Sequence, residues 1–316
     1  MRRVLITGAA GFIGSNLVKS CIEKGWTVDG VDDMSNGHQE FIPGGMNFFM
    51  TSDFAADKVL LRVKSRVYDF IFHLAAQPRV SYSVEFPIET FNTNVEKSVR
   101  LIEAARGACR RFIFASSSSI YGNVESLPTS ETQPRNPQSP YALHKGIIED
   151  VLRLNHKLYG MDSASFRFFN VYGRNQLGGS PYSTAVSAWL TAIKKGQSMR
   201  SDGDGSQTRD MVHVKDVVQA LLRGAEHHDP LCGEAFNVGT GNSVSNSQIL
   251  EWLLKKYEGA KYHDSPTRAG DVRATLADIQ NIREKLGYEP QVEFWKGLED
   301  TSSWYDDNWD LISKLV

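Results

Sequence analysis

The sequence predicts an α/β protein: a doubly wound, parallel β-sheet followed by a smaller C-terminal lobe. Between residues 4 and 173, short apolar runs alternate with amphipathic helical segments. About six such repeats are present, which is typical of a parallel sheet with right-handed crossover connections. After Gly173 the alternation gives way to polar, glycine-rich loops, and this change of texture indicates the second, smaller unit.

Composition narrows the class of protein before any motif is considered. The chain has 316 residues, of which 41% are hydrophobic and 23% charged, and its net charge is −2. These values are ordinary for a globular protein and argue against a broad basic surface for nucleic acid. No apolar run approaches the roughly 18 residues that span a bilayer, and the first run is too short for a signal peptide. We expect a cytoplasmic protein that binds neither nucleic acid nor membrane.

The cysteines give no sign of a disulfide framework or of a metal site. Cys21, Cys109 and Cys232 are odd in number and widely scattered along the chain. They form neither the paired spacing of a small disulfide-rich domain nor a CxxC pattern for zinc. We therefore expect three free thiols and no bound metal.

The first predicted strand ends in a glycine-rich turn. Residues 4–6 are apolar, and Gly8, Gly11 and Gly14 then lead into a helix. Glycines in such a turn permit a tight bend, a close approach of the backbone to a pyrophosphate, and close packing of helix on strand. The N–H groups at the start of the helix attract phosphate oxygens. The turn therefore predicts a dinucleotide site that includes the two residues between the last glycines, Phe12 and Ile13.

An acidic residue follows the second predicted strand, at residues 26–31. Asp32 lies 18 residues after Gly14. A carboxylate at this place can bind the hydroxyls of the adenosine ribose, and it repels a 2′-phosphate. The sequence therefore favours NAD over NADP as the cofactor.

Further cofactor contacts are predicted in three loops near the same edge of the sheet. Asn36 lies in the turn after the second strand, and Asp53 follows a strand at residues 47–50, where it is expected to meet the adenine edge. A clear strand at residues 68–74 is followed by small side chains, as a cofactor that lies across a strand end requires. The residues predicted in these loops are Asn36, Asp53, Phe54, Leu74, Ala75 and Ala76.

A run of serines follows the next strand. Residues 111–115 form an apolar run, and Ser116 to Ser119 stand at its C-terminal end. In open α/β sheets the carboxyl ends of the strands are where ligands bind. The serine run is therefore expected to face the ligand, opposite a helix predicted at residues 140–159.

That helix carries the candidate base. It begins with serine and proline, which is typical of an N-cap followed by the first turn. Positions i and i+4 share one face of a helix, so Tyr141 and Lys145 are expected to point the same way. A free tyrosine has a pKa of about 10, but a nearby ammonium, and a cationic nicotinamide beyond it, stabilise the phenolate and lower that pKa. The spacing thus predicts a tuned general base.

The last third of the chain supplies candidate anion-binding residues. A strand at residues 164–169 leads to Asn170, and a helix is expected at residues 182–195. Arg209 and Arg268 lie in polar, glycine-rich loops, and guanidinium groups suit a diphosphate. We expect an NAD-binding domain at residues 1–171 with 211–239, and a substrate-binding lobe at residues 172–210 with 240–316.

Together these segments resemble the extended short-chain dehydrogenase/reductases that modify sugar nucleotides. The resemblance covers nearly the whole chain and rests on motifs at residues 7–14, 31–37, 73–76, 116–122, 139–145, 168–170, 209–210 and 268–271. It implies a Rossmann fold, NAD as the cofactor and a nucleotide-sugar substrate. It also implies a homodimer formed through the helices near residues 92–107 and 140–159.

The resemblance also implies a role for individual residues. Ser117, Tyr141 and Lys145 form the catalytic set, and the last two also touch the cofactor. Asn94 supports the active-site backbone and its water network. The cofactor side further includes Asn94 and Ser116, and the substrate side includes Ser117, Ser118, Asn170, Tyr182, Arg209, Arg268, Asp271 and Thr275. Within that substrate side, the diphosphate is held by Asn170, Arg209 and Arg268.

Two positions after the catalytic serine narrow the reaction. The 4,6-dehydratases of this family carry an Asp-Glu pair there, and UDP-glucuronate decarboxylases carry a glutamate two residues before the Tyr-Gly pair. Here Ser118 and Ser119 occupy those places, and neither can act as a carboxylate acid or base. The remaining groups suffice for reversible oxidation at C4, so the chain resembles the UDP-hexose 4-epimerases.

The sequence leaves the sugar open. Thr275 stands where hexose-only relatives carry a tyrosine, so this position resembles that of epimerases which also admit N-acetylated sugars such as UDP-N-acetylglucosamine. The loop at residues 173–176, followed by Tyr182, resembles the same enzymes. UDP-glucose and UDP-galactose, and also their N-acetylated counterparts, are therefore the expected substrates.

Other reactions stay open as alternatives. Residues 73–77 and 116–122 also resemble UDP-glucuronate 4-epimerases, and Arg79 offers a cation for a uronate carboxylate. Another sugar-nucleotide dehydratase or reductase is a further alternative, as is an NAD-binding regulator without turnover. Pro78 replaces a cofactor-contacting lysine of many hexose epimerases, so the affinity for the cofactor is open too.

Overall fold

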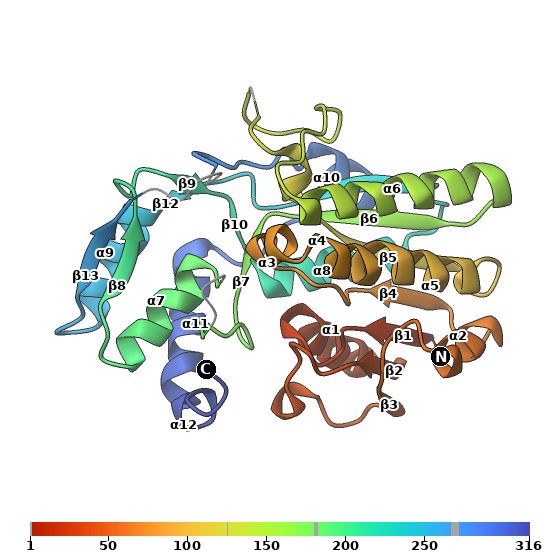
Figure 1. The fold of residues 1–316 in the computed structure, drawn as a ribbon, viewed down its shortest axis with the longest axis horizontal. Coiled ribbons are helices and arrows are strands. Elements are labelled where there is room, and N and C mark those ends of the chain that lie inside the picture. The colour runs from red at the N-terminus through yellow and green to blue at the C-terminus, as the bar shows by residue number, and fades with distance from the viewer. Residues whose placement is uncertain (1, 125, 180–182, 267–271) are drawn as a thin grey trace.

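The protein is built around one seven-stranded sheet (Figure 1). The computed structural model describes residues 2–124, 126–179, 183–266 and 272–316. The strand order is β11-β6-β5-β4-β1-β2-β3, and every pairing is parallel. The strands are β1 (Arg3–Thr7), β2 (Thr27–Asp32), β3 (Phe48–Thr51), β4 (Phe70–His73), β5 (Arg111–Ser117), β6 (Ser163–Phe168) and β11 (Glu234–Val238). The predicted doubly wound parallel sheet is confirmed.

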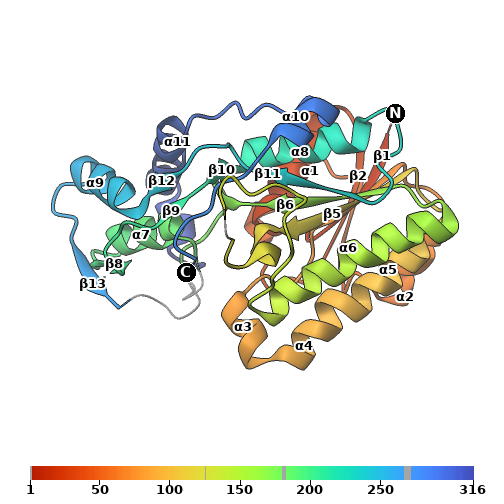
Figure 2. The ribbon, with the colours of Figure 1, turned by 90° about the horizontal axis from the view of Figure 1, so that it is seen from above.

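Helices cover both faces of this sheet, as Figure 2 shows from above. One face carries α1 (Phe12–Glu23), α8 (Val214–Glu226) and α10 (Gln280–Leu286), and the other carries α2 (Asp57–Lys64), α5 (Lys97–Ala105) and α6 (Pro140–Tyr159). Two buried apolar clusters lie between the helices and the sheet, one on each face. This double cover explains why the central strands are apolar runs rather than alternating ones.

Short helical segments lie near the carboxyl ends of the strands. They are η1 (Gln39–Phe41), α3 (Val80–Glu85), α4 (Pro87–Phe91), the π-helical turn η2 (Asn92–Glu96) and η3 (Ser118–Tyr121). The helix predicted from residue 92 onward therefore begins with a wider π turn before α5. Such turns are frequent at functional sites, and this one places Asn94 against the loop after β4.

A second body of structure, at the left of Figure 1, is built from the later part of the chain. Three two-stranded sheets in the described residues pair β7 with β10, β9 with β12 and β8 with β13. The strands are β7 (Asn170–Tyr172), β8 (Met199–Asp202), β9 (Thr208–Arg209), β10 (Met211–His213), β12 (Val244–Ser245) and β13 (Tyr262–Ser265). The helices are α7 (Ala185–Lys194), α9 (Asn246–Lys256), α11 (Phe294–Asp307) and α12 (Trp309–Ile312). They enclose an apolar core of their own.

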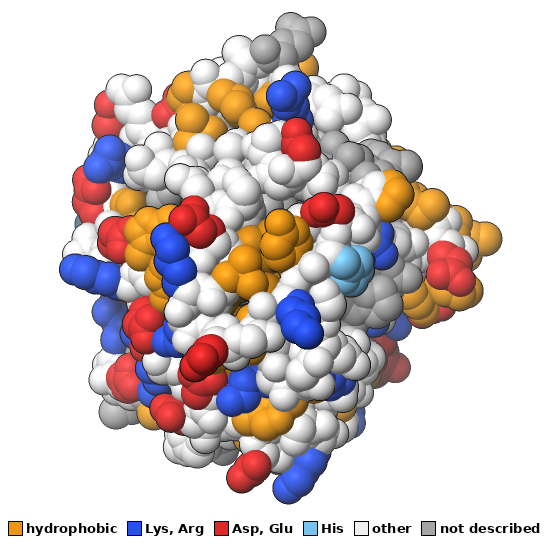
Figure 3. All heavy atoms as spheres, turned by 90° about the vertical axis from the view of Figure 1, so that its left-hand side faces the viewer, with side chains coloured by type: hydrophobic (Ala, Val, Ile, Leu, Met, Phe, Trp, Pro, Cys, Tyr) orange, Lys and Arg blue, Asp and Glu red, His pale blue; other side chains and the backbone are white. Residues whose placement is uncertain are grey.

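Two details of this lobe bear on the sequence predictions. α7 begins at Ala185 after an extended Thr184, later than the predicted start at residue 182, which lies outside the described residues. The outer face of the lobe carries interspersed basic and acidic side chains with small hydrophobic patches between them (Figure 3). None of the helices in the described part of the chain combines the length and the hydropathy that crossing a bilayer demands.

Candidate active site

The turn between β1 and α1 fits a dinucleotide pyrophosphate. Gly8 has a φ of +73°, and a Cβ on Gly14 would lie 1.9 Å from the Gly8 carbonyl oxygen, so both positions require glycine. Gly11 is the extended N-cap of α1, and no described side chain caps this helix. Since the first N–H groups of a helix have no partner within it, they are available to phosphate oxygens. These groups belong to the predicted residues Phe12, Ile13 and Gly14.

Asp32 lies beside this turn at the end of β2. Its carboxylate accepts hydrogen bonds from the backbone N–H groups of Ala10 and Met34, both at 2.9 Å. A carboxylate can accept about four such bonds, so it retains capacity for ribose hydroxyls. Burial raises its pKa, and the two N–H donors oppose that shift. Asn36 donates to Gln77 Oε1 at 3.5 Å and thus joins this turn to the loop after β4.

The two residues predicted after the third strand, Asp53 and Phe54, lie in different environments. Asp53 Oδ2 forms an ion pair with Lys97 Nζ at 2.5 Å. Phe54 is buried, with its ring 4.8 Å from that of His73, so its backbone alone is left for a cofactor contact. Lys97 is a neighbour that the sequence did not predict, because nothing along the chain connects positions 53 and 97.

The loop after β4 packs closely on the glycine-rich turn. A Cβ on Gly8 would lie 2.8 Å from the backbone nitrogen of Ala75. Leu74, Ala75 and Ala76 are partly exposed at this point, as predicted for a strand end under a cofactor. Asn94 accepts from Gln77 N at 2.7 Å and donates to Gln77 O at 3.0 Å. Asn94 thus holds the backbone of the loop at Gln77, while its amide oxygen keeps a second lone pair, so its predicted cofactor contact and supporting role stay predictions.

The serine run divides between two faces of β5, as successive residues of a strand do. Ser117 accepts hydrogen bonds from Ser119 N at 3.2 Å and Ser119 Oγ at 2.9 Å, and it also hydrogen-bonds Tyr141. Ser116 instead donates to Glu149 Oε1 at 2.6 Å in the core. Its hydroxyl is turned away from Ser117, which leaves only its backbone for the predicted cofactor contact. Ser118, the first residue of η3, is partly exposed.

α6 holds the tyrosine and the lysine on one face, as the spacing predicts. The helix begins at Pro140, and Ser139 Oγ accepts from Ala142 N at 3.2 Å. Lys145 Nζ lies 5.7 Å from the centre of the Tyr141 ring and donates to the Ala115 carbonyl oxygen at 2.7 Å. The N-cap fixes the register of the helix against β5, so Tyr141 meets Ser117 and Lys145 meets the strand backbone.

The electrostatics of this pair differ from the prediction. Burial raises the pKa of the Tyr141 hydroxyl, and the hydrogen bond with Ser117 offsets only part of that shift. Burial also lowers the pKa of Lys145 to about 7, an effect that the Glu149 carboxylate opposes. Burial, which a spacing argument does not include, is the largest cause of both shifts. The predicted lowering of the Tyr141 pKa is therefore not reached with Lys145 alone, and the further effect of a cationic nicotinamide stays a prediction.

On the substrate side, residues from distant segments meet. Asn170 Nδ2 donates to Thr275 Oγ1 at 2.9 Å, which brings together two predicted residues that lie 105 positions apart. Arg209 donates to the carbonyl oxygen of its neighbour Thr208 at 3.0 Å, and Thr275 N donates to the same residue's oxygen at 3.1 Å. The other predicted substrate residues, Tyr182, Arg268 and Asp271, lie outside the described residues.

A buried ion pair behind the site was missed by the sequence reasoning. Glu149 accepts from Arg167 Nε at 3.0 Å and from its terminal nitrogen at 2.7 Å, and both side chains are almost fully buried. The available signal was the position of Glu149 four residues after Lys145, on the same helix face. Its partner on β6 was not readable, because pairing between α6 and β6 is a property of the fold.

Comparison with known proteins agrees with this geometry. The family model described as the NAD dependent epimerase/dehydratase family matches residues 4–239. A UDP-glucose 4-epimerase from Mycolicibacterium smegmatis is 38% identical over 314 residues, covering 96% of this chain and 98% of the relative. Two solved structures reach a TM-score of 0.91, each with 97% of this chain and 99% of the other covered. One is UDP-glucose 4-epimerase from Thermotoga maritima with UDP-glucose, at 34% identity. The other is UDP-N-acetylglucosamine 4-epimerase from Methanobrevibacter ruminantium in complex with UDP-N-acetylmuramic acid, at 30% identity.

These matches confirm the resemblance found in the sequence. They extend over nearly the whole chain, and the structural likeness covers the sheet and the lobe alike. The family's name specifies the cofactor, so the prediction of NAD is confirmed as well. The chain belongs to the NAD-dependent epimerase/dehydratase family of extended short-chain dehydrogenases/reductases.

Proposed function

We propose that the protein interconverts the C4 epimers of a UDP-hexose, with UDP-glucose and UDP-galactose, and their N-acetylated counterparts, as substrates. The observation that carries this proposal is the contact between Ser117 and Tyr141 at the end of β5, with Lys145 beside them. The two following positions, Ser118 and Ser119, bear no carboxylate for elimination or decarboxylation. Curated and structural relatives that act on UDP-sugars support the same substrate class.

The chain's own residues move a proton at the C4 oxygen. Tyr141, as phenolate, takes the proton of the 4-hydroxyl, and Ser117 holds the same oxygen by a hydrogen bond. NAD, when bound, supplies the hydride acceptor and donor for C4. Because burial raises the pKa of Tyr141, the phenolate needs a nearby positive charge, which a protonated Lys145 provides in part. Tyr141 returns the proton after the sugar has presented its other face.

The substrate side must hold the nucleotide while the sugar turns. Asn170 and Arg209 lie on segments that meet beside Thr275, and they are proposed to hold the diphosphate with Arg268. We propose the domain boundaries expected from the sequence: residues 1–171 with 211–239 bind NAD, and residues 172–210 with 240–316 bind the sugar nucleotide. Rotation about the diphosphate link then exposes either face of C4 without release of the nucleotide. A cytoplasmic location is part of this proposal.

Product analysis tests the reaction. The purified protein is incubated without added NAD with UDP-glucose, UDP-N-acetylglucosamine and UDP-glucuronate in turn, and the sugars are separated by chromatography. Formation of the C4 epimer of either of the first two is expected and would show that the cofactor is retained. If only UDP-glucuronate were converted, the substrate would be a UDP-uronate and not the proposed UDP-hexose. No epimer from any of the three, with NAD also supplied, would refute the proposal.

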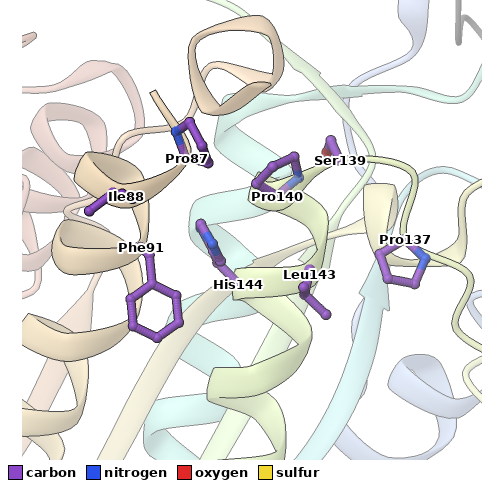
Figure 4. Close-up of a pocket in the computed structure, with 8 residues that line it drawn as sticks. All are labelled: Pro87, Ile88, Phe91, Pro137, Ser139, Pro140, Leu143 and His144. Atoms are coloured by element: carbon purple, nitrogen blue, oxygen red, sulfur yellow. The ribbon is translucent and has the colours of Figure 1, made fainter. Parts of the chain in front are cut away.

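We further propose that the protein is a homodimer that pairs through the predicted helices near residues 92–107 and 140–159, together with the adjoining α3 and α4. Many of the exposed large hydrophobic side chains of the described residues lie on or between these helices; they are Val80, Val84, Phe86, Ile88, Phe91, Val99, Leu143, Leu154, Leu158 and Tyr159. A groove between α4 and α6 has a volume of about 500 Å³. It is lined mainly by apolar side chains, which Figure 4 shows. Exposed apolar patches of this kind mark protein interfaces, and a two-fold axis would place the same helices of two copies against each other.

Sedimentation velocity tests this pairing. Ile88, on α4, is 77% exposed, and an Ile88→Asp variant is expected to sediment as a monomer. The control is Tyr262→Asp, because Tyr262 is 49% exposed on β13 in the second lobe, away from α4 and α6. A monomeric unaltered protein, or an Ile88→Asp variant that still sediments as a dimer, would contradict the proposed interface.

A further inference from the structure

The segment between β9 and β10 contains a buried carboxylate that the proposed mechanism does not use. Asp210 has no exposed surface. Each of its carboxylate oxygens accepts two hydrogen bonds. Oδ1 accepts from the backbone N–H and the hydroxyl of Thr240, both at 2.8 Å. Oδ2 accepts from the N–H groups of Gly241 and Ala277, both at 3.0 Å. One side chain thus fixes two loops that lie far apart along the chain.

The backbone of Asp210 contacts the predicted substrate residues. Its carbonyl oxygen accepts from Asn170 N at 3.1 Å and from Asn170 Nδ2 at 3.2 Å. Its N–H donates to Thr275 Oγ1 at 3.1 Å, the same hydroxyl that accepts from Asn170. Arg209 precedes it directly in the chain. Asp210 is therefore bonded to two proposed substrate residues and adjacent in sequence to a third.

Close packing leaves this carboxylate little freedom. A Cβ on Gly239 would lie 2.7 Å from Oδ2, so the strand end after β11 must carry glycine for the carboxylate to fit. In Figure 1 the segment lies where the lobe meets the large sheet, between the labels β9 and β10. A displacement of Asp210 would therefore shift the loops on both sides of the substrate region together.

We propose that Asp210 is a positioning residue for the sugar nucleotide: it acts through Asn170 and Thr275, and it sets the geometry in which they meet the nucleotide. This inference rests on the proposed function, because it assigns those residues to the substrate. Asp210 itself touches no reacting atom. Its carboxylate holds the loops at Thr240 and Ala277 by hydrogen bonds. Its backbone hydrogen-bonds the Asn170 amide and the Thr275 hydroxyl and so orients both side chains.

The pattern of donors makes a specific prediction for the amide variant. Both carboxylate oxygens face two donors each, and the side chain of asparagine offers only one acceptor oxygen. In Asp210→Asn, an NH₂ in the place of Oδ2 faces two backbone N–H donors, those of Gly241 and Ala277. An NH₂ in the place of Oδ1 still faces the Thr240 N–H, although the Thr240 hydroxyl can turn to donate to Asn242 O. Each orientation therefore leaves at least one backbone donor without an acceptor. The nearly isosteric change should be almost as disruptive as removal of the side chain, since buried donors are left without acceptors.

Calorimetric titration with UDP tests the proposal, because it measures binding without turnover. Purified Asp210→Asn is expected to bind UDP about tenfold more weakly than the unaltered protein, the size of coupling seen between contacting residues. In assays with the sugar nucleotide, KM should rise by a similar factor while kcat stays within about threefold. The amount of NAD that copurifies is expected to be unchanged.

The matched control is a second buried aspartate that also binds backbone N–H groups. Asp216, on α8, accepts from Gln291 N at 2.8 Å and Val292 N at 3.2 Å, and among the described residues it hydrogen-bonds none of the proposed substrate residues. Asp216→Asn is expected to bind UDP within about twofold of the unaltered protein. Equal weakening in both variants would reduce Asp210 to a purely structural role and overturn the proposal.

A milder pair keeps the test valid if Asp210→Asn fails to fold. Thr240→Val removes one of the four donors to the carboxylate, and Thr240→Ser restores it. We expect Thr240→Val to weaken UDP binding by about two- to threefold, and Thr240→Ser to recover it. Folded variants of Asp210 and Thr240 that bind UDP as the unaltered protein does would overturn the inference alone. Failure of the unaltered protein to bind UDP would overturn the proposed function with it.

Discussion

The cofactor side and the substrate side of the site are built in different ways. On the proposed cofactor side, most residues come from short segments at the ends of strands, such as the turn at residues 8–14 or Asp32 after β2. On the substrate side, Asn170, Arg209 and Thr275 come from distant segments that meet through Asp210 and Thr208. The first arrangement is largely local, and the second depends on polar contacts between residues 40 to 105 positions apart in the chain.

Because of this difference, the two sides should be disrupted by different kinds of substitution. A glycine-rich turn fails when one side chain is added at a crowded position. A set of loops fails when its common hydrogen-bonding partner is removed. Tyr141 lies on α6 between the two sides and belongs to the chemistry of both. Changes at these places should therefore give distinguishable losses of turnover, of bound NAD and of UDP binding.

The largest effect is expected for Tyr141→Phe. Loss of the general base should lower kcat by about 10²- to 10⁴-fold, while the bound NAD and the affinity for UDP stay nearly unchanged. Steady-state kinetics with the epimerised sugar, together with extraction of bound NAD, measure this. A variant that keeps more than about a tenth of the activity would show that another group carries the proton.

The two neighbouring serines provide the next comparison. Ser117→Ala should lower kcat by about 10²-fold, because Ser117 hydrogen-bonds Tyr141 and is proposed to hold the C4 oxygen. Ser116→Ala removes a hydroxyl that faces Glu149 in the core, so its main effect should be on thermal stability. Kinetics and melting temperature of both variants check the assignment, and a larger loss of kcat in Ser116→Ala would reverse it.

On the cofactor side, Gly14→Ala should release NAD. The added Cβ would lie 1.9 Å from the Gly8 carbonyl oxygen, so the turn must shift, at a cost of about 1–3 kcal/mol in the free energy of unfolding. Gly44→Ala is the control, because a Cβ there meets no atom within 4 Å. Urea unfolding and the NAD content of both variants measure the difference. Retention of NAD by Gly14→Ala would contradict the proposed pyrophosphate site.

The last comparison concerns pH and Lys145. Burial lowers its pKa to about 7 from an ordinary value of 10.5. Between these values the unfolded chain binds a proton that the folded protein lacks, so this lysine costs increasing stability as the pH falls from about 10.5 to about 7. As the pH falls from about 10.5 to about 7, the stability of Lys145→Met relative to the unaltered protein should therefore increase. Below about pH 7 this difference in stability should stay constant.

Melting temperatures between pH 6 and pH 10.5 measure this trend. Lys255 is an exposed lysine on α9, and Lys255→Met serves as the control. The difference in melting temperature between this variant and the unaltered protein should not change with pH. A flat difference for Lys145→Met as well would show that its ammonium is not destabilised by burial.

The sequence predicted the local parts of the molecule and missed the long-range ones. The alternation of strands and helices, the turn at residues 8–14 and the shared face of Tyr141 and Lys145 follow from periodicity and spacing. The pairing of Glu149 with Arg167 and the four bonds to Asp210 do not, since they depend on which segments pack together. The effect of burial on the pKa of Tyr141 was missed for a related reason: desolvation is set by the whole fold, whereas helix spacing reports one neighbour.

The fate of the hydrogen on C4 is the measurement that decides the proposed reaction. The protein is incubated with UDP-glucose that carries deuterium at C4, in ordinary water, and the product is examined by NMR and mass spectrometry. Reversible oxidation at C4 predicts UDP-galactose with the deuterium retained at C4. Loss of the deuterium to solvent, or a product that has lost water from C5 and C6, would contradict C4 epimerisation by Ser117, Tyr141 and Lys145.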